Sequence, residues 1–292
     1  MAAPILVFGQ NGQVARELAG LGAASGRAMR FAGRETLDLA DHGAVQGLIA
    51  AIAPSAVINA AAYTAVDRAE TEIDTAMALN RDAPAAMARA CAARGLPFVH
   101  FSTDYVFAGD LDRPYVETDP TGPIGIYGAS KLAGEQTVAG AGGAAATLRT
   151  SWVYSAHGTN FVKTMLRLAV GRDELGVVGD QRGRPTWARD CAEAALVAVD
   201  ALAADPGLAG VYHLSGAGDA TWAELAAATF EISAKRGGPS ARVRAITTAD
   251  YPTPAKRPAN SRLDCGKIEA ALPWRCRPWR DSLTACMTEM EF

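Results

Sequence analysis

The chain has 292 residues, of which 49% are hydrophobic and 20% charged, and its formal net charge is −3. This composition is typical of a soluble globular protein with one large domain or two modest lobes, and it excludes a disordered chain. The weak negative charge and the lack of a basic run argue against nucleic-acid binding. No apolar run reaches transmembrane length, and residues 1–9 have neither a charged leader nor a cleavage region. We therefore predict a cytoplasmic protein with no nucleic-acid and no membrane partner.

The cysteines are few and scattered. Their number, five, is odd, and none belongs to a CxxC pair. This spacing favours reduced thiols over a disulfide framework or a zinc site. They are Cys91, Cys191, Cys265, Cys276 and Cys286.

The chain begins with a predicted strand, a glycine turn and a helix. Residues 4–8 are a continuous apolar run, as in a buried parallel strand. Residues 9–15 follow the spacing G-x-x-G-x-x-A, a variant dinucleotide fingerprint in which Ala15 replaces the last glycine. Such a turn lets the backbone approach a pyrophosphate at a helix N-terminus, although an ordinary tight turn would look the same. The residues predicted to bind the cofactor here are Gly9, Asn11, Gly12, Gln13 and Val14.

A second strand near residues 28–32 leads to a turn with charges of both signs. In dinucleotide folds an acidic residue at this point holds the ribose hydroxyls, whereas an arginine accommodates a 2′-phosphate. Arg34 therefore favours NADPH, while Glu35 keeps NADH possible. Residues 37–41 are predicted to form a loop and helix cap, in which Asp38 and Leu39 flank an adenine ring.

Small residues follow the third predicted strand, residues 56–59, and polar residues follow the fourth, residues 96–101. The carboxyl ends of parallel strands form the ligand crevice of an open α/β sheet, so we expect the cofactor to lie there. The cofactor contacts predicted from these two segments are Ala60, Ala61, Ala62, Tyr63, Thr64 and Ser102.

The motif with the most chemical content is Tyr127-Gly128-Ala129-Ser130-Lys131. Side chains four residues apart share a helix face, so Tyr127 and Lys131 can converge. A nearby ammonium stabilises a phenolate, and we predict that Lys131 lowers the pKa of Tyr127. The Thr103 hydroxyl would hydrogen-bond the substrate oxygen that Tyr127 protonates. By itself the motif also fits a surface pair, and the dinucleotide signal upstream favours catalysis.

Other polar positions near these motifs are predicted to be structural. We interpret His100, within an apolar strand, as a satisfied core histidine, and Glu135 as a surface charge on the Tyr127 helix. The segment that follows the third strand is predicted to begin a solvated helix, with Asp67, Arg68 and Glu70.

Strands and helices alternate at regular intervals, which predicts the α/β class with a Rossmann-like, doubly wound parallel sheet. Residues 147–154 would supply its sixth strand and the exit to the second lobe. We assign residues 1–150 to a dinucleotide-binding domain, to which residues 186–215 return. Residues 151–185 and 216–292 would form a smaller α/β substrate-binding lobe.

Taken together, these segments resemble the dTDP-4-dehydrorhamnose reductase family of the extended short-chain dehydrogenase/reductase superfamily. The likeness spans nearly the whole chain, and its late motifs separate this family from other sugar-nucleotide epimerases and dehydratases. The matching segments are residues 9–14, 59–67, 102–107, 127–135, 149–154, 160–161, 180–186 and 257–263.

The resemblance implies reduction of the 4-keto group of a dTDP-4-keto-6-deoxy sugar, dTDP-4-dehydro-6-deoxy-L-mannose (dTDP-4-dehydrorhamnose), to dTDP-L-rhamnose. It implies that Tyr127 is the general acid, that Lys131 also binds the nicotinamide ribose, and that Thr103 polarises the C4 carbonyl. The implied substrate contacts are Thr103, Asp104, Tyr105, Trp152 and, near the diphosphate, Arg257.

Some members of this family resemble magnesium-bridged dimers that use acidic side chains from several segments. This chain offers Glu17, Glu289 and Glu291, but Arg189 stands where an acidic residue would be expected. A fixed cation disfavours a second one nearby. We therefore expect no metal site, with Mg²⁺ doubtful, and a monomer or weak dimer.

Two alternatives stay open at this point. The chain would act on another nucleotide-linked 4-keto-deoxysugar with the same chemistry, or it would be a non-catalytic NADP-binding regulatory subunit of the same fold. The presence of Tyr127, Lys131 and Thr103 together favours an enzyme.

Overall fold

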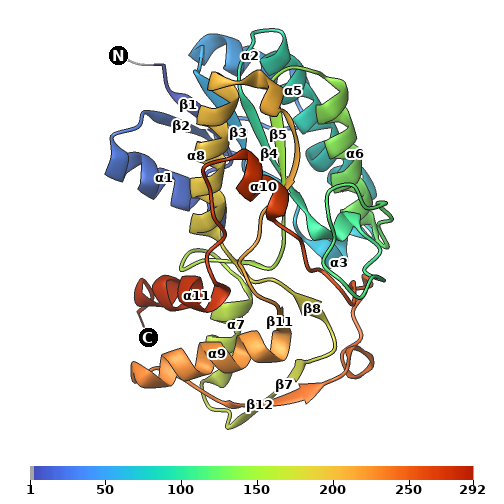
Figure 1. Cartoon of the computed structure of the whole chain (residues 1–292), viewed down its shortest axis with the longest axis vertical. Helices are drawn as coiled ribbons and strands as arrows, with labels where there is room; N and C mark the ends of the chain where they lie inside the picture. Colours follow the sequence, from blue (N-terminus) through green and yellow to red (C-terminus); the bar gives the residue numbers. More distant parts are fainter. Residues whose placement is uncertain (1–2, 292) are drawn as a thin grey trace.

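A six-stranded parallel sheet forms one half of the molecule (Figure 1). The computed structural model describes residues 3–291, so the predictions for residues 1, 2 and 292 lie outside the described chain. The strand order is β10-β5-β4-β3-β1-β2, and each neighbouring pair is parallel. The strands are β1 (Ile5–Phe8), β2 (Met29–Ala32), β3 (Ala56–Asn59), β4 (Phe98–Thr103), β5 (Ala145–Thr150) and β10 (Gly210–His213).

Helices cover both faces of this sheet, which explains why its central strands are almost wholly apolar. On one face α1 packs against α8, and on the other α5 packs against both α2 and α6. Each face has its own buried cluster, one around Leu18 and Ala195 and the other around Ile49 and Met87. The helices are α1 (Gln13–Ser25), α2 (His42–Ile52), α5 (Ala83–Ala92), α6 (Ile126–Gly140) and α8 (Ala188–Ala204). The predicted doubly wound α/β fold is confirmed.

A second, smaller lobe lies below the sheet in Figure 1 and contains the C-terminal helix. Its helices enclose separate apolar clusters around Leu283 and Phe230. A Thr221–Glu224 capping box fixes the start of α9. The elements are α7 (Phe161–Ala169), α9 (Trp222–Lys235), α11 (Trp279–Thr288), and the strand pairs β6 (Val153–Tyr154) with β9 (Thr186–Trp187), β7 (Glu174–Val178) with β12 (Arg242–Ile246), and β8 (Arg182–Gly183) with β11 (Ala220–Thr221).

Short helical segments make the remaining connections. They are α3 (Val66–Ala69), α4 (Ile73–Met77), the π-helix η1 (Ala78–Asp82), the 3₁₀ turns η2 (Asp104–Val106), η3 (Pro206–Leu208) and η4 (Thr248–Asp250), and α10 (Gly266–Ala271). Within residues 3–291 the structure has no helix that is both long enough and apolar enough to span a membrane.

The predicted strand and exit over residues 147–154 are two separate elements in the structure. β5 ends at Thr150, and the chain resumes as β6 only at Val153. Between them Trp152 has φ +49°, a left-handed conformation that an L-residue in a strand does not adopt. This break redirects the chain from the sheet into the second lobe.

Candidate active site

The carboxyl ends of the central strands meet at one edge of the sheet. The register pairs Phe8 with Asn59, and Asn59 with His100. It also pairs Thr103 with Thr150. Segments that leave these strands therefore line a common crevice, as the fold predicts.

The glycine turn after β1 lies directly against the small residues after β3. Gly9 has φ +107°, and a Cβ at this position would lie 3.1 Å from the Ala60 carbonyl carbon. Gly12 is the N-cap of α1 and provides no side-chain cap. The first N–H groups of α1 therefore have no side-chain cap and can donate to an anion. The turn also lacks side chains at Gly9 and Gly12, so a pyrophosphate can come close to the backbone. Ala15, in place of the third glycine, is fully buried without disturbing this packing.

The turn after β2 is exposed and contains both charged candidates. Arg34 and Glu35 are solvent-exposed neighbours in this turn. Asp38 accepts a hydrogen bond from the Ala40 amide at 2.9 Å, and Asp41 caps α2 through the Ala44 amide, also at 2.9 Å. Leu39 packs against the apolar cluster beneath α2. The predicted loop and helix cap are confirmed, and both Arg34 and Glu35 are accessible to a ligand.

Asn80, which sequence reasoning passed over, joins the loop after β3 to the Tyr127 helix. Its side-chain oxygen accepts from the Tyr63 amide at 2.8 Å, and its nitrogen donates to the Tyr63 carbonyl and to Ser130 Oγ, both at 3.0 Å. Ser130 Oγ in turn donates to the Tyr127 carbonyl at 2.8 Å. A fully buried asparagine in the π-helix thus fixes two candidate segments relative to each other. The only sequence signal was an amide within an alanine-rich stretch.

Tyr127 and Lys131 lie one turn apart at the start of α6, as predicted. Lys131 is buried and donates from Nζ to the Phe101 carbonyl at 2.6 Å. Burial lowers the pKa of Lys131 to about 8. Burial also raises the pKa of Tyr127 to about 12, against the opposing effect of a hydrogen bond with Thr103. The Asp104 charge raises this pKa further, so the predicted net lowering of the Tyr127 pKa is not found, and Lys131 is not among the groups that shift it in the chain without a ligand.

Thr103 and Asp104 end β4 beside this pair. Thr103 Oγ1 donates to Asp104 Oδ1 at 3.0 Å, and the Tyr105 ring packs edge-on against Tyr127 at 5.4 Å between ring centroids. Burial raises the pKa of Asp104 to about 6. Two buried oxygens, Ser102 Oγ and Asp104 Oδ2, lack a hydrogen-bond partner among the described residues. The site therefore combines a phenol, an ammonium and a hydroxyl with unsatisfied polar atoms.

We expect Asp104→Asn to stabilise the protein above about pH 7 by about 2–3 kcal/mol. The pKa of Asp104 is about 6 in the folded chain and 3.8 as an ordinary carboxyl, so the folded state binds more protons between these values. Its contribution to the free energy of unfolding therefore falls as the pH rises through this window. Urea unfolding of both proteins across the window measures the change, with the exposed Asp281→Asn as the matched control. An unchanged pH slope in Asp104→Asn would contradict the assignment.

The other predicted substrate residues lie in separate surroundings. Trp152 stacks on Trp222 in the second lobe, with 3.6 Å between ring centroids, and a Cβ at Gly183 would collide with the Trp152 ring. Arg257 is ion-paired with Asp67 at 2.9 Å. The link from the glycine turn to the second lobe is a hydrogen bond of 2.9 Å from Asn160 Nδ2 to Gln13 Oε1.

Three structural interpretations need correction or refinement. Glu135 is not a surface charge: it is buried and forms two hydrogen bonds with Arg149. Asp67 and Glu70 are not merely solvated, because Asp67 holds Arg257 and Glu70 accepts from the Ile126 amide at 2.9 Å. His100 is a core histidine as predicted, but only its Nδ1 finds a partner, Asn59, and its Nε2 has none among the described residues.

Two of the three acidic residues considered for magnesium, Glu17 and Glu289, are paired with an arginine, and the third, Glu291, is exposed. Arg189 binds buried Glu17 at 2.9 Å and Glu289 at 2.7 Å. Glu17 also accepts from Ser155 at 2.6 Å. The guanidinium thus supplies the positive charge between the two carboxylates, and these residues do not fit a divalent cation. Across residues 3–291 there is no group of three or more His, Cys, Asp and Glu placed to hold a metal ion.

Comparison with known proteins relates this arrangement to one family. Residues 3–292 match the family described as RmlD substrate binding domain. A dTDP-4-dehydrorhamnose reductase from Sinorhizobium fredii is 46% identical over 280 residues, which cover 95% of this chain and 94% of the relative. The enzyme of the same name from Escherichia coli K12 is 40% identical over 291 residues, covering 98% and 97%.

Solved structures agree with these sequence relatives. The crystal structure of dTDP-4-dehydrorhamnose reductase from Bacillus anthracis in complex with NADP superposes with a TM-score of 0.91, at 34% identity, over 99% of this chain and 100% of the other. UDP-glucose 4-epimerase from Brucella ovis in complex with NAD gives a TM-score of 0.81 at 19% identity, covering 98% and 97%, and therefore shares the fold alone.

Proposed function

Because this chain belongs to the RmlD substrate binding domain family, we propose that it reduces the 4-keto group of dTDP-4-dehydrorhamnose to dTDP-L-rhamnose with a nicotinamide cofactor. The observation that carries the proposal is the group of Thr103, Tyr127 and Lys131 at the carboxyl end of β4, at the same edge of the sheet as the glycine turn after β1.

The residues around the glycine turn fit a dinucleotide. The close approach of Gly9 to Ala60 and the uncapped start of α1 suit a pyrophosphate, and the unpartnered Ser102 hydroxyl suits a polar ligand. When bound, the nicotinamide supplies the hydride for carbonyl reduction. Residues 1–150 with 186–215 would hold the cofactor, and residues 151–185 and 216–292 the nucleotide sugar. In this proposal the reacting sugar lies between the two lobes.

Tyr127 would deliver the proton to the C4 oxygen of the sugar. With a pKa of about 12 it stays protonated at neutral pH, which is the state that a proton donor requires. Lys131, whose pKa is about 8, remains largely charged at neutral pH and would stabilise the phenolate left behind. Thr103 already hydrogen-bonds Tyr127 and would orient the same carbonyl oxygen. Proton and hydride transfer together need no covalent intermediate.

The substrate contacts proposed for the second lobe follow from its exposed polar and aromatic groups. Trp152 and Arg257 would lie along the nucleotide sugar, with Arg257 near the diphosphate. Arg257 donates from Nη2 to Asp67 and from Nη1 to the Ala255 carbonyl, and its guanidinium has further N–H groups that a diphosphate could accept from. We propose a metal-free enzyme that is a monomer or weak dimer, in line with the Arg189 bridge, and its cytoplasmic location stays a prediction.

A product assay tests the proposal directly. The purified chain is incubated with dTDP-4-dehydrorhamnose and either NADPH or NADH, with and without a chelator, and the sugar product is identified by mass and nuclear magnetic resonance. We expect dTDP-L-rhamnose in amounts that the chelator does not change. A different reduced sugar from a panel of nucleotide-linked 4-keto sugars would favour the alternative substrate. Cofactor binding without any turnover would favour the regulatory subunit.

We expect Arg34→Ala to weaken NADPH use by about tenfold or more while changing NADH use little. The exposed Arg34 guanidinium would pair with the 2′-phosphate, which NADH lacks. Steady-state kinetics with each cofactor measure the ratio of kcat/KM values, and exposed Arg30→Ala on β2 is the matched control. An equal loss with both cofactors would rule out a specific contact to the 2′-phosphate.

A further inference from the structure

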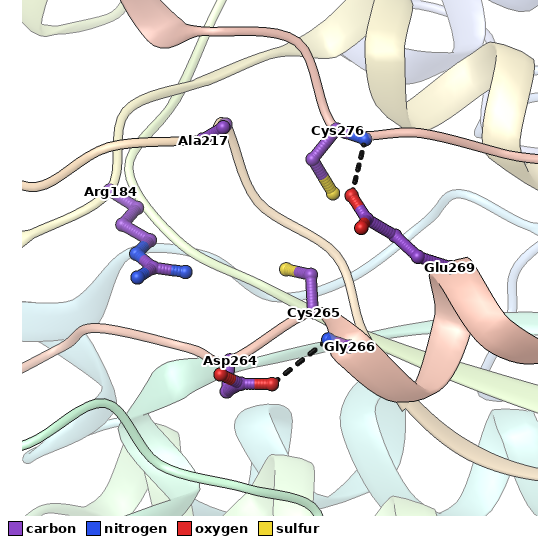
Figure 2. A pocket seen from close by; sticks show the side chains of 8 residues that line it. Arg184, Ala217, Asp264, Cys265, Gly266, Glu269 and Cys276 are labelled. Carbon is purple, nitrogen blue, oxygen red and sulfur yellow. Dashed lines mark hydrogen bonds between the residues drawn. The ribbon is translucent and has the colours of Figure 1, made fainter.

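A second cavity, of about 240 Å³, lies where the start of α10 faces the loop before α11 (Figure 2). None of the residues assigned above to the cofactor, the sugar or proton transfer lines it. Its lining instead combines one guanidinium, two carboxylates and two thiols, from Arg184, Asp264, Glu269, Cys265 and Cys276. The proposed reductase chemistry leaves this group of side chains unexplained.

The two cysteine side chains enter the cavity from opposite sides, with the sulfur of Cys265 on the side of Arg184 and that of Cys276 on the side of Glu269 (Figure 2). Cys265 Sγ lies 3.3 Å from Ser215 Oγ, and each of the two thiols shifts the pKa of the other. Glu269 on α10 accepts from the Cys276 amide at 2.9 Å, which holds the Cys276 loop against the helix that Cys265 precedes. The fold therefore holds the backbone at both cysteines in fixed positions around the cavity.

The surroundings of the pair shift the pKa values of its two thiols in opposite directions. Hydrogen bonds from Cys276 and from Ser215, together with the Arg184 guanidinium, lower the pKa of Cys265. The same hydrogen bond and burial raise the pKa of Cys276 far above that of an ordinary thiol. Cys265 is thus the more readily ionised of the two thiols, which makes it the candidate attacking cysteine and Cys276 the candidate resolving one.

The other cysteines of the chain provide an internal contrast. Cys91, Cys191 and Cys286 are buried in apolar clusters, and so is Cys265, but burial raises the pKa of each of the first three thiols, whereas hydrogen bonds lower that of Cys265. The first three line neither of the two cavities described for the chain. Only the thiolate attacks a disulfide, so these three are poor nucleophiles in the folded protein.

We propose that Cys265 and Cys276 form a thiol-modification site that takes a small disulfide and closes to an intramolecular disulfide. The Cys265 thiolate attacks one sulfur of the small disulfide, whose S–S bond breaks, and a mixed disulfide forms as one thiolate leaves. Cys276 then gives up its proton to that thiolate and attacks Cys265 Sγ, releasing the second half. Two protein thiols are oxidised and one small disulfide is reduced to two thiols.

The experiment uses the full chain and hydroxyethyl disulfide as the probe, with thiols followed by intact and peptide mass spectrometry. We expect the native protein to lose two hydrogen atoms, to fall from five free thiols to three, and to yield a linked peptide pair containing positions 265 and 276. Cys276→Ser should stop at the mixed disulfide on Cys265. Cys265→Ser should slow the overall reaction by about tenfold or more, because the favoured thiolate is gone.

Two controls keep the proposal falsifiable. Circular dichroism of each variant verifies that it is folded, and the urea-unfolded chain reports the reactivity of all five thiols without the fold. The proposal is overturned if Cys91, Cys191 or Cys286 reacts as fast as Cys265 in the native chain. It is equally overturned if Cys265 stays reduced while the unfolded chain reacts, or if the wild-type mixed disulfide persists without closing. The readout is mass alone, so failure here is distinct from failure of the reductase proposal.

Discussion

Replacement of Tyr127 by phenylalanine is expected to lower kcat by about 10²–10⁴-fold while leaving cofactor affinity nearly unchanged. The substitution removes only the phenolic oxygen, the atom from which the proton would pass to the sugar. The ring packing against Tyr105 and the backbone of α6 stay the same. Steady-state turnover and fluorescence titration of reduced nicotinamide measure the two quantities separately.

The matched control is Tyr154→Phe. Tyr154 is also buried and its hydroxyl makes one long hydrogen bond of 3.4 Å to the Trp279 carbonyl, within the second lobe. This variant should retain turnover within about threefold, because it changes the same atom without touching the proposed site. If Tyr127→Phe retained turnover, another proton donor would have to act. If it lost cofactor affinity and its melting transition together, the loss would reflect misfolding.

Local spacing was sufficient to predict the parts of the site that depend on neighbouring residues. The four-residue interval between Tyr127 and Lys131 fixes their common helix face, and the glycine turn after β1 follows from the order strand, turn, helix. The alternation of strands and helices likewise predicted the doubly wound sheet. These features require no knowledge of which distant segments touch.

The features that sequence reasoning missed all depend on contacts between distant segments. The sequence predicts Glu135 as a surface charge, but in the fold it pairs with Arg149 on β5. It likewise predicts Asp67 as solvated, but Asp67 pairs with Arg257, which lies far along the chain. The prediction of a lowered Tyr127 pKa missed the effect of burial for a related reason, because burial cannot be inferred from a four-residue spacing. The break at Trp152 reflects its stacking on Trp222, again a long-range contact.

The buried pair between Glu135 and Arg149 leads to the largest expected effect on stability. Arg149 on β5 donates to both carboxylate oxygens of Glu135 on α6, at 2.9 and 2.7 Å, and both side chains are about 95% removed from solvent. Arg149→Met keeps much of the side-chain volume but leaves Glu135 as an uncompensated buried carboxylate. We expect this variant to lose about 3–5 kcal/mol in free energy of unfolding, measured by urea denaturation.

A double variant distinguishes the destabilisation caused by an unpaired buried charge from the stabilisation that the ion pair itself provides. Combining Arg149→Met with Glu135→Leu removes both charges, and we expect it to recover most of the lost stability, because an apolar pair of similar volume needs no desolvation of ions. The exposed pair of Lys235 and Glu231 is the control: Lys235→Met should change stability by less than about 1 kcal/mol. A loss in Arg149→Met no larger than that of the control would mean that water or movement of α6 relieves the carboxylate. Since α6 also carries Tyr127, a parallel loss of turnover in Arg149→Met that the double variant restores would show that the unpaired Glu135 charge displaces the catalytic helix, whereas a loss that persists in the double variant would show that the ion pair itself holds this helix against the sheet.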